Sequence, residues 1–147
     1  MRITYKGDYA LKAMLDLAIH YGDKPVSIQH MADSLDIPIK FLEQVLLELK
    51  KGGFVDSRRG KVGGYLLAKP PSEISLGQVV RFIASPVEPI ACVEDGYKGC
   101  RDLYKCVFRD VWQRVSDATL SIVDNVTFAD LMENIKHKDT GHLVYQI

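Results

Sequence analysis

Cysteine is scarce in this chain of 147 residues, and its three copies all fall within residues 91–106. An odd number of thiols excludes complete pairing into disulfides within one chain. The sequence also has no apolar run near the roughly 20 residues that a membrane-spanning helix needs, and its N-terminus lacks the apolar block and cleavage site of a signal peptide. We therefore expect a cytoplasmic protein with no membrane partner, in which the clustered thiols serve as ligands or redox groups.

Net charge is lacking as well, because 19 Lys and Arg residues balance 19 Asp and Glu residues. The charges are unevenly placed, however, since residues 39–69 carry seven basic and three acidic side chains. A basic segment within a neutral protein is typical of a surface that binds a polyanion such as nucleic acid. A solvated basic face without a partner has the same composition, so charge alone leaves both interpretations open.

Apolar periodicity predicts a mainly helical fold. Helices are expected over residues 8–21, 28–35, 39–51 and 76–84, with Ser27 as the N-cap of the second and a capping-box spacing before the fourth. Between the third and fourth helices, two short strands, FVDS and GYLLAK, flank the basic, glycine-containing turn RRGKVG. This order of elements predicts a mainly α fold with a small β wing.

The second and third of these helices fit the geometry of a DNA-binding helix-turn-helix. Such a pair needs a small residue where the helices cross, which Ala32 supplies, and a tight turn, where Asp36 replaces the usual glycine and tolerates positive φ. Together with the strands and the basic turn, this motif predicts a winged helix-turn-helix domain over residues 1–84. The positions that lock the crossing are all apolar: Met31, Leu35, Ile37, Leu42 and Val45.

The outward side chains of this domain favour double-stranded DNA as the partner. Gln44 can bond an adenine edge in the major groove, and Glu43 can accept from cytosine while repelling phosphate at wrong sites. The basic turn suits phosphate or minor-groove contacts, although plain solvated surface is the alternative for any single side chain. The candidate DNA-binding residues are Lys40, Glu43, Gln44, Lys51, Arg58, Arg59 and Lys61.

The chain beyond this domain divides into three expected parts. They are a cysteine-containing loop over residues 85–102, a long helix over residues 103–126, and a short helix with a tail over residues 127–147, capped by Thr127 and Asp130. An apolar heptad seam runs along the long helix, and because the domain before it is already complete, we expect a seam between two subunits rather than a core-facing stripe. The seam residues are Tyr104, Phe108, Val111, Val115, Ala118 and Ile122.

These segments together resemble the Rrf-two family of bacterial transcription regulators, which includes IscR and NsrR. The resemblance is carried by YKGDYALKAMLDLA, IPIKFLEQVLLELKKGGFVDSRRGKVGGYLLAK, ISLGQVVRFI and the three cysteines that follow. It implies a homodimer that binds a pseudo-palindromic operator, with the long helix crossing its partner. It also implies an iron–sulfur cluster, of the 2Fe-2S or the 4Fe-4S type, that alters DNA binding.

The cysteine spacing, C-x7-C-x5-C, is long enough to loop around a cluster, and thiolates are the usual ligands of iron–sulfur clusters. A zinc site is a further interpretation, although the CxxC spacing of structural zinc sites is absent. A thiol redox switch is another, because Arg101 and Lys105 would favour the thiolate form. The cluster ligands under the first interpretation are Cys92, Cys100 and Cys106.

A fourth cluster ligand must come from outside the cysteine segment. Some relatives use a histidine three residues beyond the third cysteine, where this chain has Arg109. The resemblance to NsrR-type regulators suggests Asp8, reaching across the dimer, although stabilising a helix N-terminus is the commoner role of such a carboxylate. His30 is a weaker alternative, and an exogenous small molecule is another.

These inferences combine into the hypothesis of a homodimeric repressor whose operator binding changes when a cluster is lost, oxidised or nitrosylated. A cluster-free regulator of the same family, controlled by a thiol switch, a small effector or a protein partner, is the alternative. An enzyme with a cysteine nucleophile would need a nearby base, and no histidine lies between His30 and His137. A plain helical interaction module would lack salt-dependent DNA binding.

Overall fold

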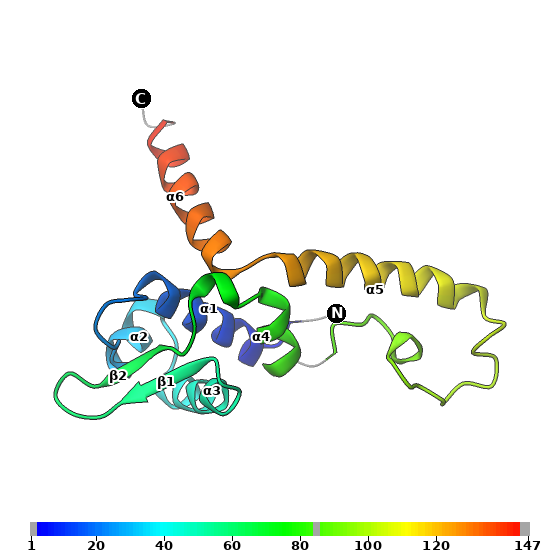
Figure 1. Ribbon diagram of the computed structural model, residues 1–147, viewed down its shortest axis with the longest axis horizontal. Helices are drawn as coiled ribbons and strands as arrows, with labels where there is room; N and C mark the ends of the chain where they lie inside the picture. The colour runs from blue at the N-terminus through cyan, green and yellow to red at the C-terminus, as the bar shows by residue number, and fades with distance from the viewer. Residues whose placement is uncertain (1–2, 84–85, 145–147) are drawn as a thin grey trace.

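The computed structural model describes the chain over residues 3–83 and 86–144 (Figure 1). The first helix, α1 (Tyr5–Ile19), begins before the expected position 8, because Thr4 already caps it. The Thr4 hydroxyl oxygen accepts a hydrogen bond from the Gly7 amide at 3.2 Å. α1 is the central element of the domain and packs against α3, α4 and α6.

Two helices and a tight turn follow, as predicted. α2 (Ile28–Leu35) is capped by Ser27, whose Oγ accepts from the His30 amide at 3.2 Å. It ends at Asp36, which takes the left-handed conformation with φ 53°, and α3 (Ile39–Lys51) comes directly after the turn. The side chains expected to lock the crossing are buried or, for Leu35, half-buried: Met31, Ala32, Leu35, Ile37, Leu42 and Val45.

The wing is a two-stranded antiparallel sheet. β1 (Val55–Arg58) pairs with β2 (Gly64–Leu67), so that Arg58 and Gly64 lie opposite each other at the base of the basic turn. Combined with the helices, the sheet confirms the predicted fold class, a mainly α winged helix-turn-helix with a small β wing.

α4 (Leu76–Ile83), preceded by the short 3₁₀ turn η1 (Pro71–Glu73), packs on α1 from another side. It opens with the expected capping box, in which Ser75 Oγ accepts from the Gln78 amide at 3.2 Å and Gln78 Oε1 accepts from the Ser75 amide at 3.0 Å. The expected end of this helix at residue 84 lies outside the described residues.

The last helix, α6 (Phe128–Val144), is longer than the short helix expected there. Thr127 and Asp130 form the predicted cap, with the Thr127 amide donating to the Asp130 carboxylate at 2.8 Å. Phe128 is fully buried in the main core, which anchors the start of α6 to the domain. The tail at residues 145–147 lies outside the described residues, and no helix of the described part is long and apolar enough to span a membrane.

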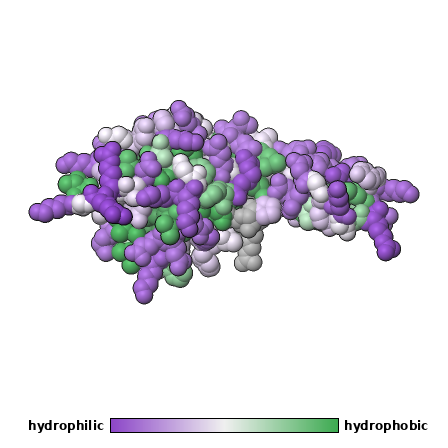
Figure 2. Space-filling model, turned by 60° about the horizontal axis from the view of Figure 1, so that its bottom comes forward, coloured by the Kyte–Doolittle hydropathy of each residue, from purple (hydrophilic) through white to green (hydrophobic). Residues whose placement is uncertain are grey.

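Between α4 and α6 the chain leaves the domain as a projecting arm, residues 86–125 (Figure 1). It passes through the 3₁₀ turn η2 (Ala91–Val93) and the cysteine loop, and returns to α4 along α5 (Val107–Asn125). Figure 2 shows the arm from another side, with hydrophilic side chains reaching outward from its tip.

The start of the long helix is a correction to the sequence-based expectation. The helix begins at Val107 and not at residue 103, and Cys106 is its N-cap. The amide of Lys105 donates to the Asp102 carbonyl at 2.9 Å and closes a turn just before the helix. Tyr104 lies in this turn with 94% of its surface exposed, so it is not part of a helical seam.

Candidate nucleic-acid interface and cysteine arm

α3 turns one apolar side to the core, and its solvent side carries polar side chains together with the exposed Phe41 and Leu47. Its buried residues are Leu42, Val45, Leu46 and Leu49, of which Leu42 and Val45 were predicted to lock the helix crossing. The opposite side is open, and an α-helix with polar side chains on its outer face fits the major groove of DNA. All four candidate DNA contacts on this helix are exposed: Lys40, Glu43, Gln44 and Lys51.

The wing gathers the three other candidate contacts at its tip. Arg58 ends β1, and Arg59 and Lys61 lie in the turn; all three are exposed. Lys50 Nζ donates to Ser57 Oγ at 2.5 Å and so joins the end of α3 to β1. α3 and the wing therefore have a direct polar connection in addition to the shared core.

A cavity of about 440 Å³ lies beside Gln44, and the sequence pattern contained no signal for it. It sits between α1 and α3, next to an ion pair in which Lys6 Nζ and Glu48 Oε2 are 2.7 Å apart. Apolar periodicity could not find it, because part of its lining lies on helix sides that the pattern assigns to solvent; Phe41, for example, is 58% exposed. The lining residues are Tyr5, Lys6, Tyr9, Phe41, Gln44 and Val45.

α5 has two unlike sides. Ser116 and Val123 are buried, and Val123 packs in a small cluster with Val80 and Val87. The other side carries the predicted seam, from Phe108 to Ile122, and it stays uncovered in a single chain. The exposed large apolar residues of this helix are Val107, Phe108, Val111, Trp112, Val115 and Ile122, at 40–74% exposure, and Ala118 is exposed as well.

All three cysteines are free thiols on the arm. Cys92 lies in η2 and Cys106 at the N-cap of α5, both half-buried, whereas Cys100 is exposed in the loop between them. Arg109, which occupies the place where some relatives have a histidine, donates from Nε to the Cys92 carbonyl oxygen at 3.1 Å. The residue that takes the place of a ligand therefore ties η2 to α5.

The donor set of the arm fits an iron–sulfur cluster in its chemistry, because three uncommitted thiols belong to one loop. Within the part of the chain that the structure describes, no three His, Cys, Asp or Glu side chains are gathered as a metal site. Asp8, near the start of α1, is paired with Lys12 at 2.7 Å, and His30 lies on α2 against His20. In this structure the three thiols therefore belong to one loop without forming a metal site.

The pKa shifts of this chain belong to local contacts at the surface of helices. The hydrogen bond to Asp8 raises the pKa of Lys12. The Thr127 amide and hydroxyl, both donating to Asp130, lower the pKa of that carboxyl group. Neither group is buried in a cleft, so these shifts do not mark a catalytic site.

Comparison with known proteins identifies the family. A family model described as an iron-dependent transcriptional regulator, Rrf2, matches residues 3–134. The chain belongs to the Rrf2 family. It is 38% identical over 134 residues to the transcriptional regulator IscR of Yersinia pseudotuberculosis, covering 91% of this chain and 80% of that protein. This confirms the resemblance to the Rrf-two family noted from the sequence motifs.

Two solved structures of the family share the fold. CymR of B. subtilis, described as its global cysteine regulator, has a TM-score of 0.78 at 30% identity, over 91% of this chain and 98% of that one. IscR of T. potens has a TM-score of 0.73 at 32% identity, over 92% of this chain and 88% of that one. Both comparisons support the winged-helix architecture along nearly the whole chain.

Family membership decides the class of function. This Rrf2 protein is a transcriptional regulator of the IscR type and not an enzyme, and DNA binding follows from the family. The individual DNA contacts, the cluster ligands and the dimer seam stay predictions. One of the two relatives of known structure is an IscR and the other is a global cysteine regulator, so family membership alone does not fix the mode of control.

Proposed function

We propose that this regulator is a homodimeric repressor whose operator affinity is set by an iron–sulfur cluster bound at Cys92, Cys100 and Cys106. The observation that carries the proposal is the position of the thiols, on a projecting arm and directly before a helix whose apolar side is uncovered in one chain. The sensing group and the dimer contact would then both belong to the arm, residues 86–125. We also propose a cytoplasmic location, where the thiols of a cluster-binding loop stay reduced.

The exposed side of α5 supports dimerisation through a second copy of the same helix. Phe108, Val111 and Val115 are 69%, 53% and 40% exposed, and a contiguous apolar surface of this kind marks an interaction site. An isologous contact would cover both copies at once, since it uses the same surface from each subunit. In this arrangement the seam runs from Phe108 to Ile122, and Tyr104 would reach the partner only from the loop.

The dimer would present two recognition helices and two wings to DNA. Two-fold symmetry in the protein then requires a pseudo-palindromic operator, with half-sites spaced by the distance between the two α3 helices. We place Gln44 and Glu43 at base edges in the major groove, where the amide fits adenine and the carboxylate accepts from cytosine. Lys40, Lys51 and the wing cations fit phosphates, which hold the protein in register.

A bound cluster, of either the 2Fe-2S or the 4Fe-4S type, would supply a redox-sensitive group at the tip of the arm. The three thiolates hold it, and Asp8 of the second copy is our candidate for the remaining position. Asp8 is paired with Lys12 on the surface, and exposed pairs of this kind are weak, so its carboxylate can exchange partners at small cost. Arg109 keeps η2 against α5 while the thiols bind.

Control of DNA binding would pass along α5. Its N-cap is Cys106, and its other end contacts α4 through Arg81 and Asp124, with Nη2 and Oδ1 2.6 Å apart. α4 packs on α1, and α1 packs on α3. A change at the thiols that moves α5 would therefore alter how the two α3 helices are spaced. A coupling free energy of about 1–3 kcal/mol would change operator affinity by about 5- to 150-fold.

Comparison of holo and apo protein on one operator tests this proposal. Anaerobically purified protein is expected to contain iron and sulfide and to absorb visible light, and Cys100→Ser to lose both while Asp95→Asn, an exposed change in the same loop, keeps both. DNase footprinting should then separate the two forms in affinity. Equal affinity of the holo and apo forms would contradict control by a cluster. Absence of iron and sulfide from the purified protein would contradict the presence of the cluster itself.

A cluster-free thiol switch is the second candidate, favoured by Cys100, which is free and exposed. Arg101 follows it directly in the sequence, and Lys105 lies in the same loop. The likeness to CymR, described as a cysteine regulator, is in line with control through sulfur chemistry. Under this alternative, oxidation of the iron-free protein changes its operator affinity, and a thiol reductant restores the original affinity. If oxidant leaves the operator affinity of the iron-free protein unchanged, the thiol switch is rejected.

A further inference from the structure

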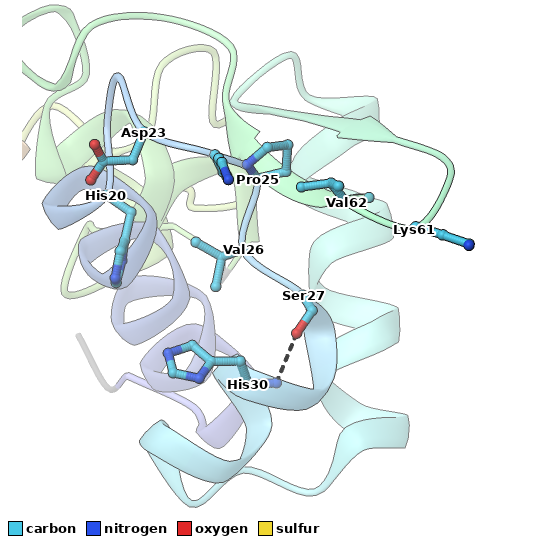
Figure 3. A pocket seen from close by; sticks show the side chains of 10 residues that line it. His20, Asp23, Pro25, Val26, Ser27, His30, Lys61 and Val62 are labelled. Carbon is cyan, nitrogen blue, oxygen red and sulfur yellow. Dashed lines mark hydrogen bonds between the residues drawn. The ribbon is translucent and has the colours of Figure 1, made fainter.

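An open cleft lies between the wing and the turn that joins α1 to α2 (Figure 3). Its two halves measure about 600 and about 670 Å³, and they share Asp23, Lys24, Pro25 and Val62 in their lining. In the close-up, Pro25 and Val62 face each other across the cleft, and Lys61 extends toward solvent from the wing. None of the predicted DNA contacts comes from the turn side, residues 22–27.

The two walls of the cleft are held together by backbone hydrogen bonds. The Val26 amide donates to the Tyr65 carbonyl at 2.9 Å, and the Tyr65 amide donates to the Val26 carbonyl at 2.8 Å. Gly64 permits this approach, because a Cβ at that position would overlap the Val26 carbonyl oxygen. The wing is therefore docked on the turn, and the two backbone segments that carry the cations are held side by side.

The lining of the cleft is basic. Lys24, Arg58, Arg59 and Lys61 border its two halves, together with the acid Asp23. Among the described residues, no ion pair engages any of these four cations. Cations that lack a carboxylate partner and share one concave surface create a positive potential that favours an anionic ligand.

The inner end of the cleft is formed by groups that are already engaged. His20 Nδ1 lies 2.8 Å from the Asp16 carbonyl oxygen, which assigns the proton to that nitrogen. The His20 and His30 rings meet edge to face with centroids 6.4 Å apart, and Ser27 Oγ caps α2. Lys24 and the wing cations, by contrast, make no side-chain hydrogen bond or ion pair among the described residues, so these positive groups are open to an anionic ligand.

We propose that this cleft binds the sugar–phosphate backbone of the operator, with Lys24 as a phosphate contact beside the wing cations. The inference rests on the proposed DNA-binding function and extends it, because the turn between α1 and α2 joins the recognition helix and the wing in the footprint. Two adjoining open pockets, each bordered by cations, suit a continuous polyanion better than one small anion. Phosphate contacts carry no base information, so Lys24 contributes affinity and not sequence preference.

Lys24→Ala tests the cleft, with Lys138→Ala as its matched control. Both lysines are exposed, and Lys138 belongs to α6, which projects away from the wing (Figure 1). Fluorescence anisotropy with the operator and a scrambled duplex, over a range of salt concentrations, gives affinity and salt slope. Lys24→Ala is expected to make the negative slope of log K against log salt shallower by about 0.9. It is expected to weaken binding to the two duplexes equally, by about eightfold near 0.1 M salt. Lys138→Ala is expected to change neither.

The outcomes separate this inference from the function on which it rests. If Arg59→Ala lowers the salt slope and Lys24→Ala leaves slope and affinity unchanged, the cleft inference alone fails. If the wild-type protein binds neither duplex in a salt-dependent way, the proposed function fails with it. Titration with inorganic phosphate, followed through the amide signals of residues 22–27, tests the other source of phosphate. Saturable micromolar binding there, with an unchanged DNA slope in Lys24→Ala, would assign the cleft to a small anion and overturn the proposal.

Discussion

Asp124 of α5 accepts a hydrogen bond from Arg81 of α4, with Oδ1 and Nη2 2.6 Å apart, directly beside Gly77. A Cβ on Gly77 would overlap the Asp124 carboxylate, so this carboxylate can take its observed position against α4 because residue 77 is glycine. The contact is where the arm meets the DNA-binding domain. Substitutions at this contact should therefore distinguish the contribution of packing to stability from the contribution of the ion pair.

Gly77→Ala is expected to destabilise the protein more than Arg81→Ala. The first places a methyl group where the Asp124 carboxylate lies and 3.1 Å from a Val123 methyl group, so both side chains must shift, and an overpacked contact of this kind is expected to cost about 1–3 kcal/mol. The second removes an ion pair whose side chains are 40% and 41% exposed, and such pairs contribute about 0.2–1 kcal/mol. Urea unfolding followed by circular dichroism measures both changes. An alanine at position 77 that leaves the unfolding midpoint unchanged would show that α5 is not packed tightly on α4.

Val115→Glu is expected to dissociate the proposed dimer. Val115 lies in the middle of the uncovered side of α5, and burying a charge there without a partner is unfavourable. We expect the dimer dissociation constant to rise by roughly tenfold or more, measured by sedimentation equilibrium. Asp117→Ala, at an exposed position off the apolar stripe of the same helix, is the control and should leave the constant unchanged. Equal behaviour of the two variants would place the dimer contact elsewhere.

Gln44→Ala and Lys51→Ala are expected to weaken DNA binding in different ways. Loss of a base contact at Gln44 should reduce discrimination at one operator position by about 1–3 kcal/mol and spare binding to a scrambled duplex. Loss of Lys51 should weaken both duplexes alike and lower the salt slope by about 0.9. Competition binding with operators substituted one base pair at a time distinguishes them. If Gln44→Ala instead lost the same affinity for every operator variant, Gln44 would not contact a specific base.

Short-range patterns were sufficient for the elements of the DNA-binding domain. Ser27 and the Ser75–Gln78 capping box mark helix starts by local hydrogen bonds, and Asp36 marks the turn by its tolerance of positive φ. The start of α5 was misplaced for an equally local reason. The apolar spacing continues back to Tyr104, but the turn closed by the Asp102 carbonyl interrupts the helix, and the heptad pattern does not register backbone bonds of that kind.

Features that depend on contacts between segments distant in the sequence could not be predicted from local patterns. The basic cleft exists because Val26 bonds to Tyr65, which docks the wing on the turn, and no local pattern links those two residues. The cavity beside Gln44 likewise needs α1 and α3 to be placed side by side. The cysteine site was predictable in its ligand chemistry alone, since convergence of the thiols depends on the loop and on the second copy.

The stability of the start of α6 is expected to fall in acid through Asp130. Hydrogen bonds from Thr127 lower the pKa of this carboxyl group below its ordinary value of 3.8, because they favour the ionised form in the folded protein. The contribution is therefore fully present above the unfolded value and is lost as pH falls through the lower, folded value. Glu133, whose pKa is lowered by Lys136, acts in the same direction on the next turn.

Hydrogen exchange of the first turn of α6 can isolate this contribution. Asp130→Asn should open this turn more readily than wild type near pH 6, and the difference should shrink as pH falls below about 4, where the wild-type carboxyl group also becomes neutral. Thr127→Val removes the hydroxyl donor but keeps the amide donor, so it should show a smaller difference with the same pH dependence. A difference between Asp130→Asn and wild type that stays constant down to pH 2 would mean that the cap acts through side-chain shape rather than charge.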